Sequence, residues 1–458
     1  MALAPFAPGG VQVRRTAEMF VQLRKQGVDL ERQLTTGKKA ESFGALGFAR
    51  RTSLDLRSKL SALDGFQSSI KDADLRLKMM LQSTENLQKI ASSTRAGALL
   101  PTSGVSGPNP LEQAQAQSNL KLAIDLLNEN INGRYLFSGA THDQKPVLGY
   151  DQIVDGVRDA IALRKTADNA DGTGFLTTSS GANPVTVTDT SPGSGFDIAG
   201  ATSSSGSIVA SGPPNASFNV IMQPNAGDTI SLRLALPDGS EEIVTLKAVA
   251  GAAGPGEFQI GAGVAGTVGN LEAALNGAIT ERAGSALAAA SAVAAAQEFF
   301  DIDANWYNGD TGAWEDARST SPVRIDATQS VGTGAQANEQ SLKTLLTQLA
   351  VLSAETFEAG DQKRYEALLT RVAGNLTPAP DQQKISDIGI ELGNAHASMD
   401  SARQRHQATS AILQNSLGDI EDAPSEEVAA KLLALQTRLQ ASYQTTSLLS
   451  KLSLVNYL

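Results

Sequence analysis

Few side chains in this sequence are of the types that carry acid–base, thiol or metal chemistry. The chain has three histidines, His142, His396 and His406, and no cysteine. His396 and His406 are ten residues apart, a spacing that does not place them on one face of a helix. The absence of cysteine excludes disulfide bonds, thiol catalysis and cysteine-ligated zinc or iron–sulfur sites. We therefore expect no enzyme active site and no bound metal or cofactor.

Two short patterns resemble ligand sites but lack essential members. Residues 301–305 (DIDAN) resemble the start of a calcium loop, yet Trp306 stands where the sharp turn needs glycine, and Gly312 where the bidentate glutamate belongs. Residues 261–266 (GAGVAG) have the form G-x-G-x-x-G without an evident βαβ unit or an acidic partner for a ribose. A solvated acidic turn and a glycine-rich loop are the better interpretations.

Composition narrows the classes of partner. The 458 residues include 37 Lys and Arg against 48 Asp and Glu, a net charge of -11, which argues against nucleic acid as the main partner. No stretch approaches the roughly 20 consecutive apolar residues of a membrane span. The opening MALAPFAPGGVQVRR has proline and glycine where a signal peptide needs its apolar segment. A cytosolic protein is the default, unless export uses an uncleaved and unstructured N-terminus.

Long amphipathic helices are predicted near both ends of the chain. Between about residues 16 and 94 apolar residues recur at steps of three and four, which keeps them on one side of a helix in a coiled-coil-like face. Residues 36–38 (TGK) and then Gly44 and Gly47 interrupt this part. The chain from about residue 341 has the same helical character. We name the following set the predicted seam: Leu56, Leu60, Leu63, Ile70, Leu77, Leu81, Val428, Leu432, Leu435, Leu439, Leu449, Leu452, Val455 and Leu458.

The middle of the chain has a different character. A helix is predicted over residues 111–131, with Asn132-Gly133 as its C-terminal cap. From about residue 141 to 340 the sequence is rich in Gly, Ser and Thr, with short alternating runs between. Residues 229–236 and 243–246, separated by the turn Pro237-Asp238-Gly239, predict a β-hairpin. Residues 271–279 and 286–300 look helical.

These features predict a mainly α protein. Its core is a discontinuous coiled-coil assembly of helices from both chain ends, interrupted by a mixed α+β outer domain. The expected division is residues 1–140 as the N-terminal half of the helical core, 141–340 as a variable, surface-exposed insert, and 341–458 as the C-terminal half that pairs with the first. An apolar end on a monomer is a liability, so we expect it to pack on the N-terminal helix or on a neighbouring subunit.

Several short motifs lie in or beside the predicted helices. They are LTTGKK at 34–39, NGRYLFSG at 132–139, NWYNGD at 305–310, ANE at 337–339, DIED at 419–422 and LLSKLSLVNYL at 448–458. Together they resemble elements of the bacterial flagellin family, which includes filament flagellins and hook–filament junction proteins. The motif at 132–139 is more typical of the junction proteins. The resemblance covers roughly residues 15–140 and 340–458.

The resemblance implies a structural and not an enzymatic role. It implies terminal helices that build a tubular core and assemble through the hydrophobic residues of the predicted seam, with an outward-projecting insert. It also implies export of the unfolded chain through the flagellar type III pathway without signal cleavage. It further implies an extracellular location in the flagellum. The implied partners are other copies of the chain, other flagellar axial proteins such as hook-associated proteins and flagellin, and a flagellar export chaperone.

Three alternatives follow from these observations. The first is a flagellar subunit, with the hook–filament junction ahead of filament-forming flagellin because of residues 132–139, although 458 residues is long for a junction protein. The second is a secreted coiled-coil adhesin with a β-rich head, which accounts for the architecture but not for the clustered motifs. The third is an enzyme carried on a helical stalk, for which the middle of the chain offers no catalytic constellation.

Overall fold

The protein is known here from a computed structural model, which describes every residue except 1–8, 101–109, 180–182, 313 and 456–458. The chain divides into two compact units. Unit 1 comprises residues 1–71, 324–329 and 399–458, and unit 2 comprises residues 72–323 and 330–398. Two long helices, α2 (Arg50–Ala98) and α9 (Ile385–Glu421), each contribute to both units. The prediction of a mainly α protein with an inserted α+β region is confirmed.

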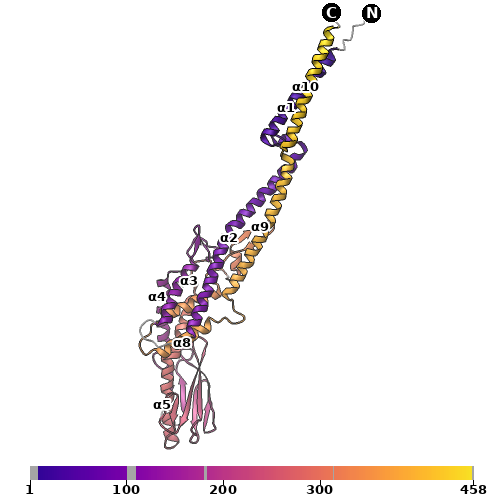
Figure 1. Ribbon diagram of the computed structural model, residues 1–458. Coiled ribbons are helices and arrows are strands. Elements are labelled where there is room, and N and C mark those ends of the chain that lie inside the picture. The colour runs from indigo at the N-terminus through magenta and orange to yellow at the C-terminus, as the bar shows by residue number, and fades with distance from the viewer. Residues whose placement is uncertain (1–8, 101–109, 180–182, 313, 456–458) are drawn as a thin grey trace, which may run out of the picture. The chain divides into compact units, whose positions relative to one another are not determined.

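Unit 1 consists mostly of helices. Its remaining elements are α1 (Gly9–Thr36), the 3₁₀ helix η1 (Phe43–Ala49) and α10 (Ser425–Val455). Helix α1 lies beside α10 (Figure 1). Gly37, with φ of 67°, follows the last residue of α1, and Gly47, with φ of 59°, lies inside η1. Glycine adopts these left-handed conformations without steric cost, so the predicted interruptions of this helical part are confirmed.

Unit 2 contains a group of shorter helices. They are α3 (Leu111–Leu127), α4 (Tyr150–Ala167), α6 (Ala288–Asp301), α7 (Gln340–Ala354) and α8 (Gln362–Asn375). Helix α6 packs against α4, α7 and α8. All seven alanines of α6 are buried, and such small side chains let neighbouring helices approach closely.

Two four-stranded sheets lie beyond these helices in the same unit. One has the order β10-β9-β8-β5 and the other β3-β4-β7-β6. The strands are β3 (Leu176–Thr178), β4 (Val185–Asp189), β5 (Asp197–Ser203), β6 (Ile208–Ser211), β7 (Ala216–Val220), β8 (Thr229–Ala235), β9 (Glu241–Val249) and β10 (Glu257–Gln259). Inward side chains of both sheets share one core with α5 (Val264–Arg282) and the π-helical turn Ala283–Leu287. Figure 1 shows α5 running alongside the strands.

The predicted β-hairpin is confirmed as β8 and β9. The strands are antiparallel, with Ala235 opposite Glu241 and Thr229 opposite Lys247. On β8, Ile230, Leu232 and Leu234 are buried while the residues between them are more exposed, as expected for a strand with one face on a core. The helices expected at 271–279 and 286–300 are also present, within α5 and α6.

The predicted end of the helix at 111–131 is wrong. Helix α3 stops at Leu127, and the next residues form the small hairpin β1 (Asn130–Ile131) and β2 (Arg134–Tyr135). Asn132 and Gly133 have φ of 53° and 78°. Two consecutive positive φ values are typical of a tight type I′ hairpin turn. The dipeptide Asn-Gly is common in this turn and also at the C-terminal end of helices. A second small pair, β11 (Pro322–Arg324) and β12 (Ser330–Gly332), completes the strands.

Candidate assembly interface

The α1–α10 pair carries the C-terminal part of the predicted seam. Val428 and Leu435 are buried, and Leu432 and Leu439 are half-buried. Leu435 lies against Gly27 of α1, where an added β-carbon would be 3.5 Å from the Leu435 Cδ2 atom. The three- and four-residue steps therefore place these four side chains on the side of α10 that faces its partner helix.

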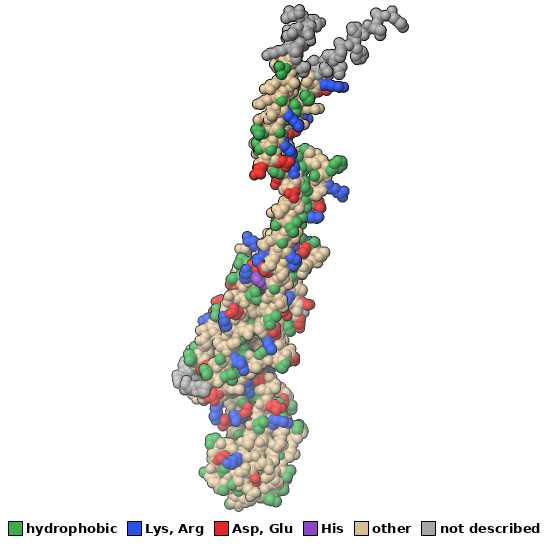
Figure 2. All heavy atoms as spheres, turned by 45° about the vertical axis from the view of Figure 1, so that its right-hand side comes forward, with side chains coloured by type: hydrophobic (Ala, Val, Ile, Leu, Met, Phe, Trp, Pro, Cys, Tyr) green, Lys and Arg blue, Asp and Glu red, His purple; other side chains and the backbone are tan. Residues whose placement is uncertain are grey.

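Apolar side chains also remain on the surface of this pair. Phe20 of α1 stacks on Tyr443 of α10 with ring centroids 5.0 Å apart, yet Tyr443 is 51% exposed. Val21 and Val28 of α1 are each 66% exposed and Leu433 of α10 is 68% exposed. Figure 2 shows apolar side chains among the charged ones along these helices. The pair thus buries one apolar side and leaves others uncovered.

The end of the predicted seam is not described at the level of side chains. The backbone of α10 continues as helix to Val455. The side chains of Leu449, Leu452 and Val455 lie outside the described part of the structure, as does the whole of Leu458.

The N-terminal part of the predicted seam lies on α2. In unit 1, Leu56 and Ile70 are buried, and Leu60 and Leu63 are half-buried. In unit 2, Leu77 is fully buried and Leu81 is half-buried. Gln67 and Asp74 lie in the same row and are both half-buried.

Helix α9 supplies the side chains opposite α2. Within unit 1, Phe66 of α2 stacks on His406 of α9 with centroids 5.8 Å apart, and the buried His406 Nε2 atom lies 2.7 Å from the Ile325 carbonyl oxygen. Within unit 2, His396 Nε2 of α9 lies 3.0 Å from Asp74 Oδ1 of α2. The histidines are therefore divided between separate packing contacts, and no described group of three or more His, Cys, Asp or Glu residues is arranged to hold a metal ion.

A charged cluster in unit 1 joins two of the family-like motifs. Glu421, from DIED, accepts hydrogen bonds from Arg57 Nε at 2.9 Å and Nη2 at 2.5 Å, and from Ser53 Oγ at 2.5 Å. Lys38, from LTTGKK, pairs with Asp422 at 2.5 Å. We name these five residues the Glu421 cluster. It ties the end of α9 to the start of α2 and to the residues after α1.

Backbone hydrogen bonds hold the same two motifs together. The Ala423 N–H donates to the Gly37 carbonyl at 2.8 Å, and the Lys39 N–H donates to the Glu421 carbonyl at 2.7 Å. These bonds satisfy groups left free where helices end. The segments that contain LTTGKK and DIED therefore contact each other through backbone atoms as well as through side chains.

The cluster fixes the protonation of its central carboxyl. The Arg57 guanidinium, which donates to both oxygens, lowers the pKa of Glu421 to about 2, although burial opposes this shift. Ser53 and Lys38 act in the same direction as Arg57. The hydrogen bond with Glu421 also raises the pKa of Arg57. At neutral pH the pair is fully ionised, as a bidentate arginine–carboxylate bond requires.

The motif NGRYLFSG lies in unit 2 and is tightly fixed there. Leu136 and Phe137 are buried, and the Phe137 carbonyl accepts a hydrogen bond from the Ala337 N–H at 2.9 Å. Gly139 has φ of 63°, and a β-carbon at this position would lie 2.6 Å from Asp310 Cβ and 2.8 Å from Gln336 Nε2. Any larger residue at Gly139 would strain the backbone and displace Asp310 or Gln336, so the surroundings favour the final glycine of the motif.

Two further family-like motifs meet this one. The Asp310 N–H, from NWYNGD, donates to the Ser138 carbonyl at 2.9 Å, and Asn338, from ANE, donates to Asp303 Oδ2 at 3.0 Å. Trp306 is fully buried, and its Nε1–H donates to the Phe300 carbonyl at 2.9 Å. Segments separated by some 200 residues of sequence thus form one packed region.

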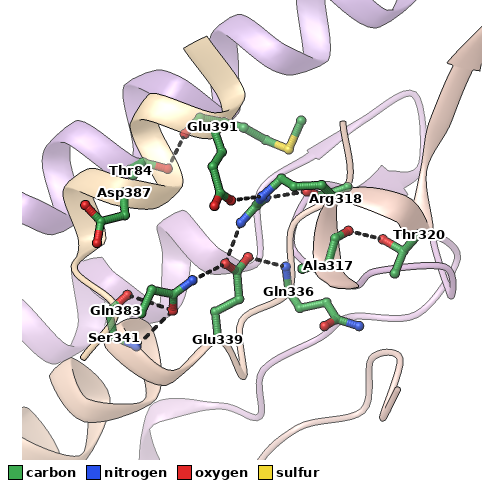
Figure 3. Close-up of polar contacts among 12 residues, drawn as sticks. Thr84, Ala317, Arg318, Thr320, Gln336, Glu339, Ser341, Gln383, Asp387 and Glu391 are labelled. Atoms are coloured by element: carbon green, nitrogen blue, oxygen red, sulfur yellow. Dashed lines mark hydrogen bonds and ion pairs between the residues drawn. The ribbon is translucent and has the colours of Figure 1, made fainter. Parts of the chain in front are cut away.

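A buried carboxylate stands at the start of α7 in this region (Figure 3). Glu339 pairs with Arg318 and accepts hydrogen bonds from Gln383 Nε2 at 3.0 Å and from the Gln336 N–H at 3.1 Å. Arg318 also bonds Glu391 Oε2 at 2.9 Å. Burial raises the pKa of Glu339. The charge of Arg318 and the hydrogen bonds from Arg318, Gln336 and Gln383 act in the opposite direction. The network links α7, α9 and the 3₁₀ helix η4 (Trp314–Thr320).

The comparison with protein families agrees with this geometry. Residues 381–458 match the family model described as the bacterial flagellin C-terminal helical region. The matched segment contains α9 and α10 with Glu421 and the C-terminal part of the predicted seam. No match was found among curated proteins. The family match supports the place of this chain among the bacterial flagellins, a family of structural proteins that self-assemble into the extracellular flagellar filament.

Sequence reasoning missed the partners of the motif residues. It singled out DIED and LTTGKK but not Ser53 and Arg57, which lie on α2 without any distinctive pattern around them. It likewise missed Arg318, the counter-ion of Glu339.

Within the described part of the chain, no helix is long and apolar enough to cross a membrane.

Proposed function

We propose that this flagellar structural protein is a subunit of the hook–filament junction, that is, a hook-associated protein, which assembles through its terminal helices. The observation that carries the proposal is the NGRYLFSG motif at 132–139, which resembles that of junction proteins. Its hairpin turn, the buried Leu136 and Phe137 and the crowded Gly139 give these parts of the motif a structural reason. A filament-forming flagellin is the second candidate, favoured by the length of the chain.

The predicted seam, together with the exposed apolar residues of the α1–α10 pair, is the proposed route of assembly. Val428 and Leu435 are buried within one chain, whereas Val28 and Leu433 are largely exposed. Copies that pack side by side would bury the second group, as helices do in a multi-stranded coiled coil. In this proposal residues 1–140 and 341–458 build the assembled core and residues 141–340 face the solvent.

The partners follow from the same proposal. They are further copies of the chain, other axial proteins of the flagellum including flagellin, and an export chaperone that holds the terminal helices before export. A chain without cysteine suits export in an unfolded state through the type III pathway, because no disulfide has to form or be broken on the way.

Deletion of the protein in cells tests the junction role. Filaments should then be shed into the medium, and immunogold labelling of wild-type flagella should mark one short zone between hook and filament. Attached filaments after deletion, or label along the whole filament at thousands of copies per cell, would exclude the junction and favour the filament flagellin.

A truncation tests the proposed route of assembly. Removal of residues 448–458 should leave a soluble chain that no longer polymerises, because the end of α10 is lost. Polymerisation at an unchanged critical concentration would refute the seam as the assembly surface.

A further inference from the structure

Three basic side chains from separate segments line one small cavity in unit 2. They are Arg76 of α2, Arg134 of β2 and His142 in the loop that follows. The cavity has a volume of about 20 Å³, enough for about one water-sized group. Tyr135, Leu136 and Gly139 of NGRYLFSG also line it.

The fold holds these groups in place. The Asn132-Gly133 turn sets the hairpin that presents Arg134. The Tyr135 N–H donates to the His142 carbonyl at 2.8 Å, which fixes the loop carrying the histidine beside the hairpin. Leu136, directly after this strand, is buried in the core. The backbone segments that carry the three groups are therefore fixed by the fold, while Arg134 itself is exposed at the rim of the cavity.

None of the three basic groups has an acidic partner within salt-bridge distance among the described residues. Burial and the nearby Arg134 lower the pKa values of both Arg76 and His142. Asp72 raises the pKa of Arg76, and Asp143 raises that of His142, in each case by charge attraction without a salt bridge.

Other partly buried arginines of this unit are paired. Arg164, 23% exposed, bonds Asp168 at 2.9 Å, and Arg318, 18% exposed, bonds Glu391 at 2.9 Å. A guanidinium withdrawn from water needs a counter-ion to offset its lost hydration. Arg76 is half-buried and lacks one in the single chain.

We propose that this cavity receives an Asp or Glu carboxylate of a second copy of the chain. Two guanidinium groups and an imidazole provide the charge and the N–H donors that a carboxylate accepts. The small volume fits one oxygen of a side-chain carboxylate, and a chain with 48 acidic residues presents many such groups. This inference rests on the proposed function, since it assigns part of NGRYLFSG to contact between assembled copies.

Zero-length cross-linking identifies the partner directly. In Arg76→Lys and Arg134→Lys variants a carbodiimide joins the new amine to any carboxylate in contact with it. Assemblies made from equal amounts of ¹⁴N- and ¹⁵N-labelled chains should yield mixed-isotope cross-linked peptides at either position. Arg158→Lys on α4 is the matched control, because Arg158 pairs with Asp155 of its own helix at 2.7 Å and should link only within one copy.

Assembly provides the second measurement. Arg76→Gln and Arg134→Gln should each raise the critical concentration about tenfold, and Arg158→Gln should leave it unchanged. Unaltered thermal unfolding of the unassembled variants would show that folding is intact. The rise should shrink in 0.5 M salt, because screening already weakens the wild-type contact.

The outcomes separate this inference from the proposed function. Assembled Arg76→Lys and Arg134→Lys copies without a mixed-isotope link, or Arg→Gln variants that assemble at the wild-type concentration, would overturn the inference alone. Binding of inorganic phosphate to the unassembled chain, followed by the His142 ring signals in NMR, with no effect of the variants on assembly, would instead identify a free-anion site and overturn it. Failure of the wild-type chain to assemble under any condition would contradict the proposed function and the inference together.

Discussion

Helices α7 and α10 use their apolar residues in opposite ways. In α7 every residue from Leu345 to Ala354 is buried, because α3, α4, α6 and α8 surround it. In α10, among the residues whose side chains are described, only Val428 and Leu435 are buried, and α1 is its main packing partner. Each large apolar side chain left in water forgoes about 1.5–3 kcal/mol of stabilisation. Helix α7 is therefore fully packed within one chain, while α10 carries apolar surface that α1 leaves exposed.

The largest expected effect is in the helix that is already fully packed. Leu346→Ala in α7 removes a fully buried side chain and should lower the free energy of unfolding by about 2–5 kcal/mol. Urea denaturation, followed by far-UV circular dichroism that reports on the helices of both units, measures this loss. Leu433→Ala in α10 is the matched control, and its effect should stay within about 0.5 kcal/mol. Equal losses for the two variants would contradict the comparison.

A smaller effect is expected at the Glu421 cluster. Glu421→Gln leaves Arg57 without its counter-ion and should destabilise unit 1 by about 1–3 kcal/mol. Faster hydrogen exchange at the start of α10 and the end of α9 would report the loss. Glu427→Gln, which breaks only an exposed pair with Lys431, should give no measurable change. Similar exchange in both variants would show that the cluster contributes little.

The same cluster makes unit 1 sensitive to acid. The pKa of Glu421 is about 2 in the folded chain, below the value of about 4.3 for an unfolded glutamate. The carboxylate therefore contributes its stabilisation fully above about pH 4.3 and loses it as the pH falls toward 2. The stability difference between wild type and Glu421→Gln should be constant above pH 5 and shrink below pH 4. A difference independent of pH down to 2 would contradict this assignment.

The sequence allowed much of the helical part to be predicted, because periodicity is a local signal. Steps of three and four correctly marked the sides of α2 and α10 that are buried within the chain, for example Leu56, Leu77 and Leu435. Asn132-Gly133 misled because the same dipeptide suits a helix end and a hairpin turn, and only the pairing of Ile131 with Arg134 distinguishes them.

Contacts between distant segments were beyond such reasoning. Glu421 and Arg57 are 364 residues apart, and neither has a neighbour pattern that names the other. The same holds for Arg76 and Arg134, which share a cavity although they lie on different elements. The family-like motifs drew attention to residues such as Glu421, but the residues that contact them could be identified only from the folded structure.

The central claim is that the exposed apolar side of the α1–α10 pair is the assembly surface. The most direct test of this claim changes exposed residues and should alter the stability of the single chain least. The variant Val28→Ser with Leu433→Ser alters two largely exposed side chains. Sedimentation should show the critical concentration of assembly raised at least tenfold, with the unfolding free energy unchanged within about 0.5 kcal/mol. A control on an exposed polar residue of the same helix, Gln440→Ser, should assemble normally. Assembly of the double variant at the wild-type concentration would contradict the account.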